Sequence, residues 1–330
     1  MLGTTAVLAL METKGIGRKT IARLWQLEIA ESAGPHDMHD LLSNLKETYP
    51  HTPLPGLPAL QRGLDRAERV LEACATNHIG VVTPADTSFP NHLHHIPDPP
   101  PLLFYRGRLS SCTERPVVAI VGTRSPSNYG LSCSRRLGRV FAQHGFTVVS
   151  GLALGCDVAA HRGCLDAGGT TSAILAHGLN SIHPRQHRRI ADRLLAEGGC
   201  LLSEYAPGTP PHRNHFVMRN RLQSGLSEGT VVVETGLSGG TMHTARFALE
   251  QGRVLGCLTH QLRQQGDYIA GNELLLQEDS ALPLGSKEEI ERFMESMLKS
   301  ATQMPTHNPY VATKTPASPK SIVSAQLSLF

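Results

Sequence analysis

The chain lacks the features that mark membrane and secreted proteins. No apolar run reaches the about 18 residues of a membrane-spanning helix, and the apolar N-terminal stretch has neither a basic region nor a small-residue cleavage site. The seven cysteines are scattered and form no C-x-x-C pair, which is typical of reduced thiols. We therefore expect a cytoplasmic protein with no membrane attachment.

Motifs for cofactors and metals are also missing. There is no G-x-x-x-x-G-K-[ST] sequence, and of a dinucleotide-binding G-x-G-x-x-G only Gly122 is in place. No cluster of carboxylates could hold Mg²⁺, and the closely spaced histidines have no carboxylate or cysteine at a matching spacing. We expect no cofactor, no metal site and no catalytic residue, and hence a protein that is not an enzyme.

From residue 116 onward, short apolar runs alternate with helical patterns. The first run, "PVVAIVG", is apolar throughout, as expected for a strand buried on both faces. Strands that alternate with helices indicate an α/β fold with a doubly wound parallel sheet. In such a sheet, ligands bind at the carboxyl ends of the strands. The runs that follow are "FTVVS", "TSAILA", "CLLSE", "GTVVVE" and "RVLGCL".

Four regions are expected along the chain. Residues 1–80 form a helical domain around a Lys14-Gly15-Ile16-Gly17 turn, and residues 81–285 form the sheet domain, which opens with a proline-rich extended connector over 83–103. Residues 286–299 form a helix capped by Ser286. The tail over 300–330 is rich in proline, serine and threonine, and we expect it to be disordered.

Two loops after strands are suited to phosphate. Gly122, Thr123 and Arg124 place a cation and a hydroxyl beside a helix N-terminus. The alternative is a plain strand-to-helix turn capped by Ser127 or Asn128. In the second loop, glycines precede Thr241 at the start of a helix, which forms a nest of backbone amides.

Two further stretches have both a functional and a structural interpretation. Asp157 and His161 lie one helical turn apart and could form an acid–base pair, but we favour an aspartate and a histidine that hold the loop. Arg213, Arg219 and Arg221 lie within nine residues that contain no acid. Such cations bind phosphate backbones, although a solvated basic helix is the alternative.

Several blocks together resemble the DprA/Smf family of DNA-processing proteins. They are "VAIVGTRSPSNYG", "GFTVVSGLALGCDVAAHRGCLDAGGTTSAIL", "LLSEYAPGTPP", "HFVMRNRLQSGLS", "VVVE" and "SGGTMHTARFALEQGR". The resemblance implies an extended Rossmann-like domain that forms a homodimer. It also implies a mediator that protects single-stranded DNA without sequence preference and helps load RecA in natural transformation or recombination.

The resemblance assigns the DNA-binding positions and shows three departures from the family pattern. Thr123 replaces the usual serine, the proline-glycine after the last strand is absent, and only one helix and a tail stand where many members have a winged-helix domain. The N-terminal glycine turn resembles a helix-hairpin-helix, which could contact DNA or be purely structural. The predicted phosphate-binding residues are Gly122, Thr123, Arg124, Arg213, Arg219, Asn220, Arg221, Gly240 and Thr241.

Two other functions stay open. A nucleotide hydrolase of the lysine-decarboxylase-like (LOG) group has a related sheet, but its P-G-G-x-G-T-x-x-E loop requires a glutamate that is absent after Thr241. A nucleotide sensor could instead use the two amide nests for a mononucleotide.

The last five residues are apolar at three positions and end a polar tail. They resemble the peptide by which bacterial polymerases and repair proteins dock on the DNA polymerase sliding clamp. The motif consists of Gln326, Leu327, Ser328, Leu329 and Phe330. The alternative is a chance hydrophobic terminus.

Overall fold

The computed structural model describes residues 3–25, 34–259 and 268–302. The predicted disorder of the tail and the clamp-binding motif at 326–330 lie outside the described residues. Within the described part of the chain, no helix combines the length and the apolar character needed to cross a bilayer.

The centre of the fold is a nine-stranded sheet with the order β1-β2-β6-β5-β4-β3-β7-β8-β9. Neighbouring strands from β6 to β9 along this order are parallel, whereas β1 and β2 add to the edge of β6 as antiparallel strands. The strands are β1 (Gly80–Val82), β2 (Leu103–Gly107), β3 (Val117–Val121), β4 (Thr147–Ser150), β5 (Thr171–Leu175), β6 (Cys200–Ser203), β7 (Gly229–Val232), β8 (Val254–Leu258) and β9 (Leu282–Leu284).

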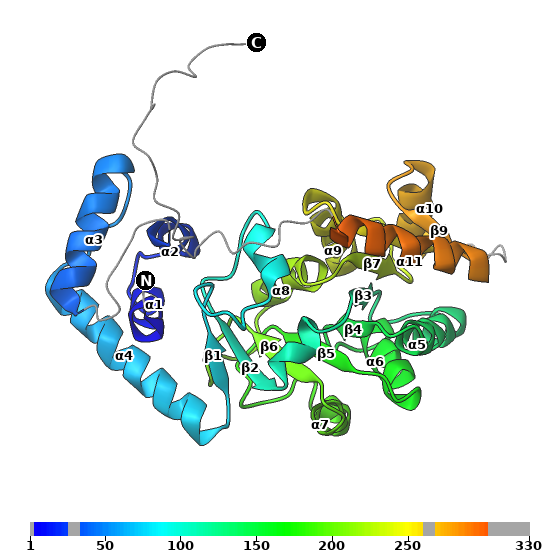
Figure 1. Ribbon diagram of the computed structural model, residues 1–330, viewed down its shortest axis with the longest axis horizontal. Helices are drawn as coiled ribbons and strands as arrows, with labels where there is room; N and C mark the ends of the chain where they lie inside the picture. Colours follow the sequence, from blue (N-terminus) through cyan, green and yellow to red (C-terminus); the bar gives the residue numbers. More distant parts are fainter. Residues whose placement is uncertain (1–2, 26–33, 260–267, 303–330) are drawn as a thin grey trace, which may run out of the picture.

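Helices cover both faces of the sheet (Figure 1). On one face Val118 of β3 shares a hydrophobic cluster with Leu137 of α5 and Phe293 of α11. On the other face Val117 shares a cluster with Leu222 of α8. The α-helices are α1 (Thr4–Met11), α2 (Arg18–Leu24), α3 (Pro35–Thr48), α4 (Leu57–Thr76), α5 (Asn128–Gln143), α6 (Cys156–Asp166), α7 (Arg188–Ala196), α8 (Arg213–Gly225), α9 (Gly240–Glu250), α10 (Ala270–Gln277) and α11 (Lys287–Thr302).

The predicted α/β fold is confirmed, and the apolar runs found in the sequence are the central strands. Every residue of β3 is buried, because helices pack on both sides of it. The predicted C-terminal helix is α11, and Ser286 caps it by accepting a hydrogen bond from the Glu289 N–H at 3.2 Å. This helix extends to Thr302, so the predicted start of the tail at residue 300 is too early.

The proline-rich connector was only partly predicted. Residues 83–103 were expected to be extended, but they contain the 3₁₀-helix η1 (Asn91–His95) and lead directly into β2. Two more 3₁₀ turns, η2 (Leu109–Cys112) and η3 (Arg185–His187), complete the described elements. Phe89, Leu93 and Ile96 of the connector are buried in one cluster with Leu103 of β2, so the connector packs against the sheet domain.

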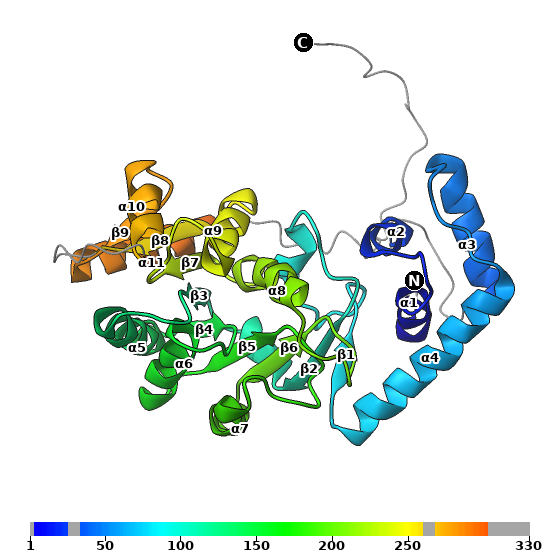
Figure 2. The ribbon, with the colours of Figure 1, turned by 180° about the vertical axis from the view of Figure 1, so that it is seen from behind.

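The N-terminal helices lie at the β1 end of the sheet (Figures 1 and 2). The turn between α1 and α2 contains Gly15, whose φ of 94° favours glycine. One hydrophobic cluster joins Leu8 of α1 and Leu60 of α4 with Leu102 and with Leu201 of β6. The helical layer is therefore packed onto the sheet domain through a shared core.

Candidate phosphate-binding pocket

A pocket of about 660 Å³ opens beside the carboxyl ends of β3 and β7. These two strands are neighbours, but the chain forms β4, β5 and β6 on one side of β3 before it returns to form β7 on the other side. Such a reversal of strand order leaves a crevice between the loops, where ligands of α/β proteins bind. The helices α8 and α9, which lie side by side in Figure 2, complete the pocket.

The pocket brings together all the predicted phosphate-binding residues except one. They come from three separate stretches of sequence, and the sheet places these stretches at one edge. The predicted residues that line the pocket are Gly122, Thr123, Arg124, Arg213, Arg219, Asn220, Gly240 and Thr241. Arg221 is the exception.

Arg124 is an exposed cation that an aromatic ring holds in place. Its guanidinium carbon lies 4.8 Å from the centre of the Phe216 ring, a distance at which a cation is attracted to the ring face. The preceding residue is fixed by the backbone, because the Thr123 N–H donates to the Glu234 carbonyl at 2.8 Å. The loop therefore presents a permanent charge at a defined place.

The N-terminus of α5 is capped by the protein itself. The Ser127 hydroxyl accepts from the Gly130 N–H at 3.0 Å and donates to a Glu234 carboxylate oxygen at 2.6 Å. The other Glu234 oxygen accepts from the Ser127 N–H at 2.8 Å. Ser127 therefore caps this helix, and the phosphate interpretation of the loop depends on Arg124, which would hold any anion here.

The N-terminus of α9 has no such cap. Its N-cap residue is Gly239, which has a φ of 119° and no side chain to accept from the first backbone amides. The Asn220 side-chain amide donates to the Gly240 carbonyl at 2.9 Å and fixes the turn. Helix N-termini of this kind attract anions through their amides and the helix dipole. The predicted amide nest is therefore present at the pocket.

Arg213 begins α8 and is exposed at the pocket. His212 caps this helix, because its Nδ1 accepts from the Asn214 N–H at 3.3 Å. Phe216 lies three residues after Arg213, so both side chains are on one face of the helix. Sequence reasoning missed Phe216, although this spacing from Arg213 was available as a signal.

Arg219 forms part of the floor of the pocket and is only 3% exposed. One of its guanidinium nitrogens donates to the Ile174 carbonyl at 2.5 Å. Burial lowers the pKa of Arg219 to about 10, against the opposing effect of the nearby Asp157. A side chain at Gly151 would collide with this guanidinium, so the arginine would have to move. Arg219 is therefore a buried structural cation and not the surface contact that was predicted.

Asp157 holds the loop after β4, as favoured from the sequence, whereas His161 contacts Thr171 at the start of β5. The Asp157 carboxylate accepts from the Gly151 N–H at 3.1 Å and the Ala153 N–H at 3.4 Å. Burial raises the pKa of Asp157. The Thr171 hydroxyl donates to the Val148 carbonyl at 2.7 Å, so it must accept from Nδ1 of His161. Asp157 and His161 are therefore not arranged as an acid–base pair.

Arg221 was predicted to contact phosphate, and the structure corrects this. Its side chain is 3% exposed and lies outside the pocket. Both carboxylate oxygens of Glu204 accept from it, at 2.6 and 2.7 Å, and Asp98 accepts from its Nε at 3.1 Å. A guanidinium that already has two carboxylate partners and no access to solvent cannot bind a phosphate backbone.

Among the residues that the structure describes, no group of three or more His, Cys, Asp and Glu side chains could hold a metal ion. The chemistry of the pocket is that of two exposed cations, Arg124 and Arg213, an uncapped helix N-terminus and an aromatic ring. The protein is thus a doubly wound α/β protein, and the pocket at the switch point of its sheet carries groups that attract anions.

Comparisons with known proteins agree with this class. Residues 80–295 match the family model described as DNA recombination-mediator protein A, and the chain belongs to that family. Protein Smf of Synechocystis sp. is 34% identical over 297 residues, which cover 84% of this chain and 73% of the relative.

Two solved structures are similar over most of their length. The X-ray structure of DNA processing protein A from Streptococcus pneumoniae has a TM-score of 0.74 and 26% identity, and it covers 88% of this chain and 98% of the other. DNA processing protein A from Helicobacter pylori has a TM-score of 0.57 and 29% identity, with 68% and 98% covered.

Proposed function

We propose that the pocket binds the phosphate backbone of single-stranded DNA without sequence preference. The observation that carries the proposal is the convergence of Arg124, Arg213 and the uncapped N-terminus of α9 in one cavity. The structure of the Helicobacter pylori relative was described for its single-stranded DNA binding mode, which supports the proposal.

The Phe216 ring favours a single strand over a duplex. The ring is half-buried in the wall of the pocket, and a base that has left its stack can pack against it. Bases in a duplex are paired and stacked with each other and cannot do so without being extruded. The cations supply affinity that falls with salt, and the ring supplies a contact that every base can make.

The test is a titration of fluorescent single-stranded and double-stranded oligonucleotides at several salt concentrations. The proposal requires tighter binding of the single strand, similar affinity for different base compositions and an affinity that falls steeply with salt. Equal binding of both forms, or binding that salt does not change, would contradict it.

Membership of the family supports a wider role, which we propose as follows. The protein acts in the cytoplasm as a non-enzymatic homodimer that protects single-stranded DNA and hands it to RecA during recombination or natural transformation. Light scattering tests the dimer. Strand exchange by RecA on DNA coated with single-strand-binding protein, with and without this chain, tests the transfer.

Clamp docking through residues 326–330 is a separate proposal based on the motif. Leu327, Leu329 and Phe330 would enter an apolar cleft of the sliding clamp, with Gln326 as a hydrogen-bonding group. Ordering the tail offsets much of the gain from burial, so we expect an affinity in the micromolar range. Clamp binding should be lost in a variant with Gln326→Ala, Leu329→Ala and Phe330→Ala. Equal binding by this variant and the unmodified chain would contradict the proposal.

The second candidate function is nucleotide binding or hydrolysis. It is favoured by the volume of the pocket, which lies in the range of small-molecule sites. Against hydrolysis, Asp157 is the acid among the lining residues, and it is committed to two backbone N–H groups. Incubation with nucleoside monophosphates tests this function, because a hydrolase would release free base.

A further inference from the structure

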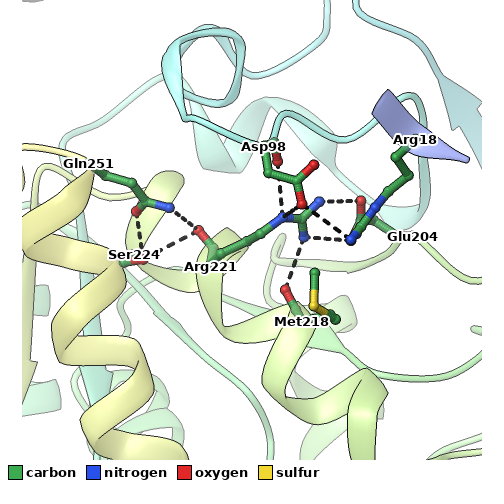
Figure 3. Close-up of polar contacts among 7 residues, drawn as sticks. All are labelled: Arg18, Asp98, Glu204, Met218, Arg221, Ser224 and Gln251. Carbon is green, nitrogen blue, oxygen red and sulfur yellow. Dashed lines mark hydrogen bonds and ion pairs between the residues drawn. The ribbon is translucent and has the colours of Figure 1, made fainter. Parts of the chain in front are cut away.

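A partly buried cluster of charges joins the N-terminal helical layer to α8 (Figure 3). Arg18 is the first residue of α2. Its guanidinium nitrogens lie 3.2 Å from a carboxylate oxygen of Asp98 and 3.4 Å from one of Glu204. Both carboxylates also pair with Arg221 of α8. The charges of two arginines and two carboxylates therefore balance each other. They meet where the start of α2, the proline-rich connector and the end of β6 lie together.

The members of this cluster differ in exposure. The side chains of Glu204 and Arg221 are 4% and 3% exposed, whereas those of Arg18 and Asp98 are 30% and 35% exposed. The inner pair depends on its partners because water cannot replace them. In the outer pair, Arg18 and Asp98, either side chain can lose its partner because water can hydrate the charge that is left. Arg18 is thus the one arginine of the cluster that can be changed without leaving a fully buried charge alone.

The cluster is connected to both helices that line the pocket. Arg221 belongs to the helix that presents Arg213 and Phe216. Its carbonyl accepts from the Gln251 side chain at 2.9 Å, and the Ser224 hydroxyl donates to the same side chain at 2.6 Å. Gln251 directly follows α9, whose first turn lines the pocket.

We propose that Arg18 is a positioning residue for the phosphate-binding pocket. By completing the charge cluster, it ties the N-terminal helices to α8 and so keeps the Arg213 end of that helix at the pocket. Arg18 itself makes no contact with DNA. The inference rests on the proposed single-stranded DNA binding for its main test, and it adds a role for the N-terminal helices in that binding.

The first experiment measures single-stranded DNA affinity and its salt dependence for Arg18→Ala, Asp98→Asn and the double variant. Arg18→Ala should weaken binding about five- to tenfold, a typical size for coupling between sites. The slope of log affinity against log salt should not change, because no phosphate contact is lost. The double variant should bind as the weaker single variant does, since both changes break one link.

The matched control is Lys19→Ala. Lys19 is the next residue, is exposed and carries the same charge in the same turn, so its loss should alter neither affinity nor slope. Arg18→Lys, which keeps an ion pair with Asp98, should recover part of the affinity. A slope that falls by about one unit in Arg18→Ala would mean a direct phosphate contact and would overturn the proposal.

A second measurement is independent of DNA. Amide hydrogen exchange in the first turn of α8 should be faster in Arg18→Ala than in Lys19→Ala or the unmodified protein. If the unmodified protein bound no single-stranded DNA, the proposed function would fail, and faster exchange would still support the link. Unchanged exchange in Arg18→Ala would overturn the positioning role whatever the DNA result.

Discussion

The two ends of α8 carry arginines with opposite roles. Arg213 in the first turn is exposed at the pocket, whereas Arg219 and Arg221 near the other end are buried. All three are in one acid-free stretch of sequence, so they cannot be distinguished by their neighbours in the chain. The fold separates them, because the helix runs from the solvent into the body of the protein.

The difference comes from carboxylates that are distant in sequence. Asp98 and Glu204 approach Arg221 from the connector and from the end of β6, and Asp157 lies near Arg219. None of them reaches Arg213 or Arg124. A cation is available for phosphate only where the fold leaves it without a carboxylate partner, so basic residues in a sequence identify a DNA-binding surface only together with the acids packed against them.

The stability of the protein should fall most when a charge is removed at the buried end of α8. Glu204→Ala leaves Arg221 buried with only the half-exposed Asp98, and breaking a buried pair in this way costs about 3–5 kcal/mol. Chemical denaturation measures the loss. The control is Glu114→Ala, which removes an exposed pair with Arg108 in which both side chains are about half exposed, and should cost less than about 1 kcal/mol. Equal losses in both variants would remove the distinction between buried and exposed pairs.

Buried histidines should make the body sensitive to acid. Burial lowers the pKa of His161 to about 3 and that of His94 to about 4, both below the ordinary 6.5. The unfolded chain therefore binds protons that the folded protein does not, and stability falls as the pH decreases from 6.5 toward these values. The loss at about pH 5 should be on the order of 2 kcal/mol for each histidine.

Denaturation at neutral pH and at about pH 5 checks this expectation. His94→Gln should reduce the difference between the two conditions, and the exposed His144→Gln is the matched control. The same pH dependence in both variants would show that His94 is not the source.

Much of the sheet and of the pocket could be predicted from the sequence. Strands buried on both faces are continuous apolar runs, so β3 to β8 are visible without a structure. The carboxyl ends of parallel strands lie at one edge, which brings the loop at Gly122 near the loop at Gly240. Local sequence is enough for these features because each strand and each loop has its own signal.

The parts that could not be predicted depend on contacts between distant segments. The antiparallel strands β1 and β2 are short, and the prolines just before β2 made its sequence resemble a connector instead of a strand. The burial of Arg221 depends on Asp98, which lies 123 positions away in the sequence. No local pattern records such a pairing, and the acid-free stretch around Arg221 indicated the opposite.

Phe216 should contribute to affinity without contributing to salt dependence. Phe216→Ala removes a stacking surface worth about 1–3 kcal/mol per base, and it also removes the ring beneath Arg124. No charge is lost, so the slope of log affinity against log salt should be unchanged. The control is Phe247→Ala, which removes a half-buried ring on α9 outside the pocket. A lower slope in Phe216→Ala would mean that the ring acts mainly by holding Arg124 on the phosphate.

The smallest expected effects are those of the exposed arginines taken one at a time. Arg124→Ala and Arg213→Ala should each weaken single-stranded DNA binding about tenfold at low salt, equally for all sequences. Each should lower the log–log salt slope by about one unit, since one phosphate contact is lost. Arg246→Ala removes an exposed arginine of α9 outside the pocket and should leave the slope unchanged. Stability should be unaffected in all three variants, in contrast to Glu204→Ala. If neither Arg124→Ala nor Arg213→Ala changed the slope, the two arginines would not belong to the DNA-binding site.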